Sequence, residues 1–192
     1  MEEGARRSKL PVDPGRAYRL INPGGILLLT AATSEARNLM SLAWHMPLSF
    51  EPPLLAIAVG QGRFTATLIA ESGEFALNVP PPELVEKVYR AGKTSAAGGG
   101  DKFSALGLTP EPARVIKAPL VAECQGHIEC RVEAEYPGGD HRLFVGRVVA
   151  ASVIARFFDG AWRLGPGGTA LLHHLGGERF AIADKTIEPG SS

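Results

Sequence analysis

A polar and aromatic segment at residues 38–53 lies between two strand-length apolar runs, and this arrangement constrains the fold more than any other feature. The flanking runs, residues 26–32 and 54–59, have the length and composition of buried β-strands. Inside the segment, asparagine, serine and histidine side chains interrupt the apolar face. The segment closes on two consecutive prolines, which cannot continue a sheet ladder. We therefore predict a β protein in which packing alone does not explain residues 38–53.

The composition is typical of a globular protein with one domain. The chain has 192 residues, 45% of them hydrophobic, with 23 Gly and 15 Pro, which suits a turn-rich β fold with a substantial core. Lys and Arg number 20, as do Asp and Glu, so the formal net charge is zero. That balance gives no electrostatic reason to expect nucleic acid or a membrane surface as a partner, and it permits self-association. The apolar run at residues 24–32 is too short to span a membrane, and we expect a cytoplasmic protein.

Short apolar runs alternate with turn signals along the rest of the chain. We expect strands at residues 26–32, 38–46, 54–59, 74–79, 120–136, 143–154 and 170–174, and helices at residues 65–71, 83–91 and 101–106. No internal repeat is visible, so the predicted domain covers residues 18–184, with a flexible N-terminal arm at 1–17 and a tail at 185–192. Many short strands with few helices predict a mainly antiparallel β-barrel with short flanking helices.

The loop at residues 61–65 joins the third predicted strand to the first predicted helix, with Thr65 as the expected N-cap. A helix N-terminus offers unpaired N–H groups and the positive end of a dipole. With the guanidinium of Arg63 and the hydroxyl of Thr65, this loop can hold a phosphate. A capping threonine beside a surface arginine is also common, so the residues alone leave both interpretations open.

Several short motifs follow one another in a fixed order between residues 23 and 177. They are Asn38-Leu39-Met40-Ser41, Trp44-His45, Leu48-Ser49-Phe50-Glu51-Pro52-Pro53, Arg63-Phe64-Thr65, Asp101-Lys102-Phe103 and Gly139-Asp140-His141. As a spaced set they resemble the flavin reductase-like family of FMN-binding split barrels, which includes flavoredoxins. The resemblance implies a Greek-key split β-barrel, FMN as cofactor, NAD(P)H as electron donor, and a homodimer whose second subunit completes the flavin cleft.

The resemblance also implies which residues contact the cofactor. Backbone groups of residues 38–49 would line the pyrimidine edge of the flavin, and the loop at 61–65 would carry its phosphate. The predicted cofactor-binding residues are Asn38, Met40, Ser41, Trp44, His45, Met46, Arg63, Phe64, Thr65, Lys93, Ser95 and Lys102. From the residues alone, the tryptophan and the methionines are better explained as core side chains, since aromatic residues and methionine are mainly packing residues.

The loop at residues 92–100 departs from the family pattern. Five small residues at 96–100 replace a more polar family segment that reaches the cofactor phosphate. The predicted contacts of Lys93, Ser95 and Lys102 therefore compete with a simpler interpretation, a solvated surface loop.

His141 is the predicted catalytic residue. It follows the turn between the two longest predicted strands. In similar proteins the Asp-His pair at this position lies at the cofactor pocket, where the imidazole contacts the flavin or the incoming nicotinamide. A single histidine at a turn is also commonly a surface residue with no catalytic role.

The remaining reactive side chains predict no metal site. His173 and His174 are adjacent, so on a strand they point to opposite faces and cannot bind one ion together. Cys124 and Cys130 fall within one predicted strand, where they are too far apart for a disulfide. We predict buried, reduced thiols.

The predicted function is that of an NAD(P)H:flavin (FMN) oxidoreductase, which transfers a hydride from NAD(P)H to flavin. A flavoredoxin-type electron carrier, whose tightly bound FMN is reduced by a protein partner, is the alternative. A split barrel that binds another ligand is a third possibility. A monooxygenase or another redox protein is an expected partner. The sequence leaves NADH and NADPH undistinguished, because no ribose-reading residue can be identified outside a Rossmann context.

Overall fold

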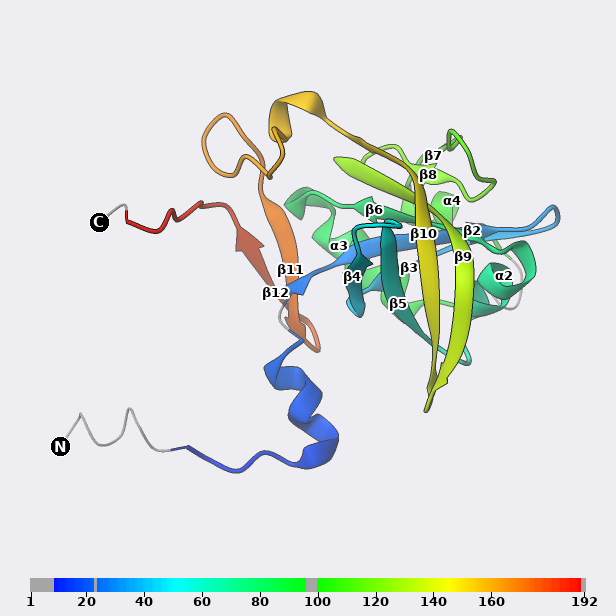
Figure 1. Ribbon diagram of the computed structural model, residues 1–192, viewed down its shortest axis with the longest axis horizontal. Helices are drawn as coiled ribbons and strands as arrows, with labels where there is room; N and C mark the ends of the chain where they lie inside the picture. The colour runs from blue at the N-terminus through cyan, green and yellow to red at the C-terminus, as the bar shows by residue number, and fades with distance from the viewer. Residues whose placement is uncertain (1–8, 23, 96–99, 191–192) are drawn as a thin grey trace.

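The computed structural model describes residues 9–22, 24–95 and 100–190, and strands dominate its architecture (Figure 1). Within these ranges, seven strands form the main sheet: β2 (Leu27–Ala32), β3 (Arg37–Leu42), β4 (His45–Ser49), β5 (Leu54–Gly60), β6 (Glu74–Val79), β9 (Gly126–Gly138) and β10 (His141–Val153). The smaller sheets of the described chain are β1 (Gly24–Gly25), β11 (Leu171–Gly176) and β12 (Arg179–Ala183), and β7 (Pro110–Glu111) with β8 (Leu120–Val121). The α-helices are α2 (Phe64–Ser72), α3 (Val85–Lys93) and α4 (Lys102–Leu106), and the 3-10 helices are η1 (Pro14–Leu20), η2 (Pro82–Leu84) and η3 (Ala155–Phe157).

The strand order of the main sheet brings its two edges together. Among the described strands the order is β3-β2-β6-β9-β10-β5-β4, and every pairing is antiparallel. Strands β3 and β4 are the two edges, yet only Ala43 and Trp44 separate them in the chain. Two residues cannot cross a flat sheet of this width, because strands lie about 4.8 Å apart and an extended residue spans at most about 3.6 Å. The sheet therefore curls until its two edges approach each other at residues 43–44, which we call the seam, and the predicted antiparallel barrel is confirmed.

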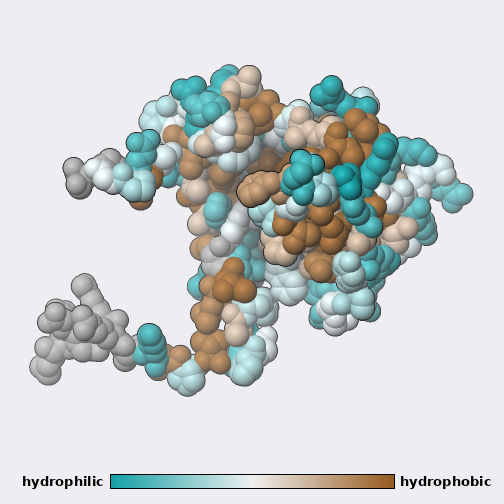
Figure 2. Space-filling view, in the orientation of Figure 1, coloured by the Kyte–Doolittle hydropathy of each residue, from teal (hydrophilic) through white to brown (hydrophobic). Residues whose placement is uncertain are grey.

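The N-terminal segment carries a helix outside the barrel. Helix η1 overlaps the end of the predicted arm at residues 1–17, and its N-cap Asp13 accepts a hydrogen bond from the Gly15 amide. Residues 1–8 lie outside the described residues, and the mobility of the arm stays a prediction. Figure 2 shows apolar side chains along η1 and on the front face of the barrel. Leu20, the last residue of η1, and the following Ile21 are both strongly exposed.

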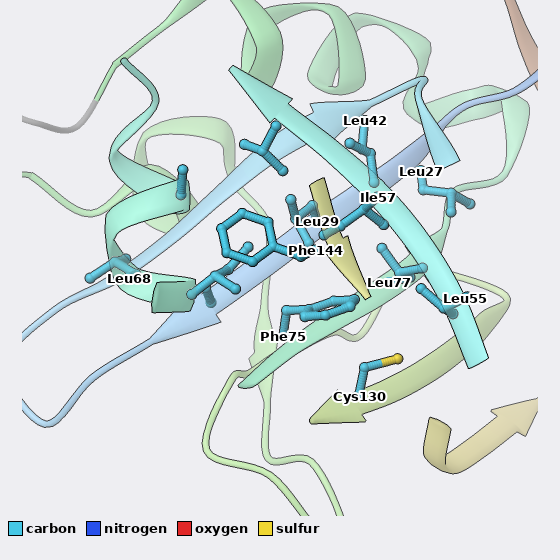
Figure 3. Close-up of a cluster of buried hydrophobic side chains, with 14 residues drawn as sticks. Leu27, Leu29, Leu42, Leu55, Ile57, Leu68, Phe75, Leu77, Cys130 and Phe144 are labelled. Carbon is cyan, nitrogen blue, oxygen red and sulfur yellow. The ribbon is translucent and has the colours of Figure 1, made fainter. Parts of the chain in front are cut away.

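The barrel interior is filled by closely packed apolar side chains. Phe75, Phe144 and Leu29 are completely buried and lie close together in this cluster (Figure 3). Leu28, the neighbour of Leu29 on β2, belongs to a second cluster formed with α3 and α4. Strand β2 is therefore buried on both faces, which explains why residues 26–32 read as a continuous apolar run rather than an alternating one.

Two of the predicted strands are each broken into two. The strand expected at residues 38–46 ends at Leu42, and β4 begins at His45 on the other edge of the sheet. The strand expected at residues 120–136 is interrupted by a turn that contains Cys124, so the two cysteines do not share a strand. Both cysteines are buried and free, as predicted, and burial raises the pKa of Cys130 to about 12.

The start of helix α2 also differs from the prediction. Thr65 is not the N-cap: the cap position is Arg63, which makes no side-chain capping bond, and Thr65 is buried in the first turn. The helix ends at Gly73, whose φ of 68° is in the left-handed region that favours glycine. In the part of the chain that the structure describes, no helix is long and apolar enough to cross a membrane.

Candidate functional site

A cavity of about 570 Å³ opens at the barrel seam. Its walls come from the end of β3, residues 43–44 of the seam, the end of β5 with the following turn, the segment after α3, and the start of β10 with the turn before it. The lining residues are Met40, Ser41, Leu42, Ala43, Trp44, Ala58, Gly60, Gln61, Gly62, Arg63, Ser95, Asp140 and His141. The volume falls within the roughly 300–1,000 Å³ typical of small-molecule sites.

Strand pairing and loop contacts determine which residues meet at the cavity. The register of β5 with β10 sets Gly60 opposite His141. The turn after β5 is tied to the β9–β10 hairpin, because Gln61 donates from its backbone N to Asp140 O at 3.0 Å and from Nε2 to Gly139 O at 2.7 Å. These bonds fix the loop at residues 61–65 relative to the β9–β10 hairpin that carries His141.

A stacked aromatic pair forms one part of the cavity wall. The rings of Trp44 and His141 have centroids 4.5 Å apart and an interplanar angle of 28°. Trp44 is further held by Nε1, which donates to Asn22 Oδ1 at 2.8 Å, and by the edge of Tyr18. The pair therefore forms a pre-positioned aromatic part of the cavity wall.

The imidazole of His141 is oriented by a carboxylate. His141 Nδ1 lies 2.6 Å from Asp140 Oδ1, and the hydrogen bond from His141 holds the pKa of Asp140 below its ordinary value. With Nδ1 donating to Asp140, the tautomer is fixed and Nε2 is left for interactions elsewhere. The Asp140 side chain is almost fully exposed, so this is not a buried ion pair, and its effect is to orient the imidazole ring.

The N-terminus of α2 gives the cavity a cationic part. The first turn of α2 has no side-chain cap, and Arg63 at the cap position lines the cavity. Arg63 Nη1 donates to Gly92 O at 3.2 Å, which holds the guanidinium beside the end of α3. A guanidinium next to uncapped helix N–H groups has the chemistry of a phosphate site.

Asn38 and Thr65 lie behind this wall instead of lining it. Both are buried, and Asn38 Nδ2 lies 2.9 Å from Thr65 Oγ1. The bond ties β3 to the first turn of α2. Asn38 Oδ1 is a buried side-chain oxygen for which the described residues provide no hydrogen-bond partner. The two residues fix the relative position of the strand and the helix that carry the wall.

Lys102 likewise supports the wall from inside. It is 5% exposed, and its ammonium donates to Ala91 O at 2.7 Å and Thr94 O at 2.9 Å. Burial, reinforced by the nearby charge of Arg63, lowers the pKa of Lys102 to about 8. Arg63 and Lys102 thus donate to the carbonyls of Gly92 and Ala91 in the last turn of α3. The negative end of the helix dipole also favours these two cations there. This arrangement fixes the chain just before Ser95, which lines the cavity.

The structure brings six of the thirteen predicted site residues to one cavity. Those that line it are Met40, Ser41, Trp44, Arg63, Ser95 and His141. Asn38, Thr65 and Lys102 support the wall, Phe64 packs against the interior cluster, His45 and Met46 line a hollow beside η1, and Lys93 lines a smaller cavity nearby. Their roles in binding stay predictions.

Sequence reasoning missed two kinds of wall residue. Ala58 lines the cavity only because the sheet register places it there, and alanine gives no chemical signal. Gln61 matters through bonds to the distant hairpin, which its position in the loop does not reveal. Within the described ranges, no group of three or more His, Cys, Asp and Glu side chains is arranged to hold a metal ion.

Comparison with known proteins gives the family of this chain. The model of the flavin reductase like domain matches residues 18–176. The chain therefore belongs to the flavin reductase-like family.

Several relatives extend over most of the chain. The Escherichia coli (strain K12) protein YddH, which is described as uncharacterized, is 33% identical over 94% of this chain and 98% of its own length. The NADH-dependent FMN reductase AsuE2 of Streptomyces nodosus subsp. asukaensis is 28% identical over 84% of this chain and 80% of its own length. Among solved structures, an FMN-binding protein from Thermus thermophilus superimposes with a TM-score of 0.82 at 25% identity, covering 95% of this chain and 99% of that one. The split-barrel architecture is thus that of FMN-binding proteins.

Proposed function

We propose that the protein binds FMN in the seam cavity and transfers a hydride from NAD(P)H to the flavin. One observation carries the proposal: a single cavity combines a cationic helix N-terminus with a stacked indole and imidazole. The first suits a phosphate and the second suits a flat ring system. Membership of the flavin reductase-like family supports the same ligand.

The phosphate part of the site uses donors that are already in place. Arg63 has five guanidinium N–H groups, of which the bond to Gly92 O uses one, so the others are available to phosphate oxygens. The uncapped first turn of α2 adds backbone N–H groups. Ser41 gives its hydroxyl hydrogen to Val88 O, so its Oγ can only accept from a ligand. Charge neutralisation therefore rests mainly on Arg63.

The aromatic part of the site positions the reacting rings. When bound, the flavin supplies the redox chemistry, so the chain need provide neither a nucleophile nor a strong acid. Trp44 and His141 form a fixed wall that limits how a planar ligand lies, and it excludes water from one side. His141, held through Nδ1 by Asp140, orients the nicotinamide with Nε2. Backbone N–H groups of residues 41–44 donate to the electron-rich edge of the flavin.

We extend the proposal to a homodimer, because an apolar edge of the sheet lies open. Strand β4 is an edge strand, and it exposes Met46 and Leu48, with Phe50 just beyond it 99% exposed. Apolar side chains on an uncovered edge strand mark an interaction surface. A second copy seated on this edge would face the hollow that His45 and Met46 line. Sedimentation equilibrium should give twice the chain mass, and Phe50→Glu should shift the protein toward the monomer.

The proposed reaction needs an electron donor and an acceptor for the reduced flavin. The name of AsuE2 specifies NADH as its donor, which makes NADH the first donor to try here. A monooxygenase or another redox protein is the expected acceptor of the reduced flavin.

The deciding experiment is an anaerobic visible spectrum of the FMN-loaded protein before and after addition of NADH or NADPH. Loss of the flavin absorbance band within seconds supports the proposed reductase. A bound flavin that stays oxidised with both donors and is reduced only through a protein partner identifies an electron carrier instead. A protein that cannot be loaded with FMN overturns the proposal.

A further inference from the structure

The side chain of Trp44 stands between two hollows of the molecule. It lines the seam cavity, and it also lines the hollow of about 540 Å³ beside η1. Trp44 lies in the seam, outside both β3 and β4, and it is 38% exposed. A ring with open space beside it is restricted less by packing than a ring in a filled core. Directional contacts are therefore needed to hold the indole where it stacks on His141.

One of these contacts determines the orientation of the Asn22 amide. The indole Nε1–H group can only donate, so the Asn22 atom that lies 2.8 Å from it is the acceptor Oδ1. The other amide atom, Nδ2, can only donate, and it lies 3.2 Å from His174 Nδ1. A hydrogen bond between these two atoms requires that His174 Nδ1 carries no hydrogen.

The second ring nitrogen of His174 meets this requirement. His174 Nε2 lies 3.1 Å from Gly177 O, which can only accept, so Nε2 carries the ring hydrogen and Nδ1 is free to accept. Donors and acceptors therefore match from the indole of Trp44, through Asn22 and His174, to Gly177 O. Turning the Asn22 amide over would set donor against donor and acceptor against acceptor, and both of its bonds would be lost.

These hydrogen bonds connect the smaller sheet to the seam of the barrel. His174 belongs to β11, where it pairs with Gly24 of β1, and its ring centroid lies 5.3 Å from that of Phe180 on β12. Asn22 lies between η1 and β1, and the seam belongs to the main sheet. A histidine fixed in one sheet thus determines how an amide supports a side chain of the other.

We propose that Asn22 and His174 are positioning residues for Trp44. Asn22 holds the indole against His141, and His174 holds the Asn22 amide in the one orientation that can accept from the indole. The inference rests on the proposed function, in which the bound rings lie against this wall. Neither Asn22 nor His174 lines the seam cavity, so both act through Trp44.

The first test needs no ligand. Trp162→Phe leaves Trp44 as the single tryptophan of the chain, and time-resolved fluorescence anisotropy then reports the rotation of its indole. In this background Asn22→Leu, which keeps a similar size but no acceptor, should add a fast local rotation on the picosecond to nanosecond scale. His174→Leu should add a smaller one. Asn22→Asp keeps an acceptor for the indole and should add none.

The matched control is His173→Leu. This residue is the neighbouring histidine of β11, and its side chain points to the opposite face of the strand. The substitution should leave the rotation of Trp44 unchanged. Rotation that is no faster in Asn22→Leu than in His173→Leu would overturn the inference. Rotation that is faster in Asn22→Leu but unchanged in His174→Leu would overturn the role of His174.

The second test measures flavin binding and turnover with both tryptophans present. Asn22→Leu should weaken FMN and riboflavin by a similar factor, on the order of fivefold, because the indole meets the ring system that both flavins share. The value of kcat for NADH oxidation should fall as well, and Asn22→Asp should recover most of both losses. A loss for FMN without a loss for riboflavin would place the effect at the phosphate and overturn the inference.

The two tests separate this inference from the proposed function. If the wild type binds neither flavin, the proposed function fails, while the anisotropy comparison still decides whether Asn22 and His174 hold Trp44. If the wild type binds flavin and Asn22→Leu binds and reduces it equally well, the inference is overturned and the proposed function stands.

Discussion

The barrel interior and the seam cavity are built in different ways. The interior is a packed cluster in which Phe75 and Phe144 are completely buried and polar contacts are few. The wall of the cavity is held by side chains that bond to backbone carbonyls, such as Arg63 to Gly92 O and Lys102 to Thr94 O. The stability of a packed apolar cluster does not depend on charge, but it falls when volume is added. Hydrogen bonds from charged side chains to carbonyls depend on charge and pH. Substitutions inside should therefore change stability, and those at the seam should change binding.

The largest effect should come from adding one methyl group to the interior. A Cβ on Gly146 would lie 2.5 Å from Phe75 Cζ and 3.1 Å from Cys130 Cβ. Gly146→Ala should lower the free energy of unfolding by about 3 kcal/mol, because the buried ring has no free space to move into. Urea denaturation measures the loss. Gly25→Ala, where an added Cβ meets no atom within 4 Å, is the matched control, and an equal loss there would contradict the explanation.

The next effect concerns the cationic part of the cavity. Arg63→Ala should weaken FMN binding by roughly 30-fold, equivalent to about 2 kcal/mol, because a charge-assisted contact to phosphate is lost. Arg63→Lys should recover part of the affinity, since it keeps the charge but not the planar fork. Riboflavin, which has no phosphate, separates the two explanations. An equal loss for riboflavin would mean that Arg63 acts by holding the end of α3.

The third prediction uses the titration of Lys102. Its pKa is about 8 in the folded chain and about 10.5 in the unfolded chain, so between these values the unfolded chain binds a proton that the folded chain does not. The free energy of unfolding should therefore rise as the pH increases through this window. Relative to Lys102→Met, the wild type should gain on the order of 2 kcal/mol between pH 7.5 and pH 10. A difference that stays constant with pH would show that the ammonium keeps an ordinary pKa.

The smallest effect should be that of His141. His141→Ala should lower kcat for NADH oxidation roughly three- to fivefold, because the imidazole positions the donor. It should weaken FMN binding no more than about twofold, because Arg63 and the indole of Trp44 remain. Asp140→Asn keeps the ring but replaces the carboxylate that orients it, and it should cause a smaller decrease. Unchanged turnover of His141→Ala at saturating NADH would remove the residue from the mechanism.

How much of the molecule could be predicted from the sequence differs between the same two regions. The runs at residues 26–32 and 54–59 predicted β2 and β5 well. Strand β2 is buried on both faces, and β5 places Leu55, Ile57 and Val59 in the interior cluster, so both strands leave a local apolar signature. The break at Ala43 and Trp44 left no such local signature in the sequence, since it arises from closure of the sheet around distant strands. Lys102 was expected at the cofactor, but its ammonium bonds to carbonyls at the end of α3, and that pairing exists only after α3 and α4 have packed.

The two-residue seam has a consequence for the lifetime of the protein in the cell. Because Ala43 and Trp44 join the opposite edges of one sheet, a ligand that lies against them also contacts β3 at one edge and β5, the neighbour of the other edge strand. Under the proposed function, flavin binding then resists the opening of the barrel, by about 2.7 kcal/mol when free flavin is at 100 times its dissociation constant. Flavin supply would thus set how often the chain opens to proteases, and cells short of flavin would clear the empty protein first.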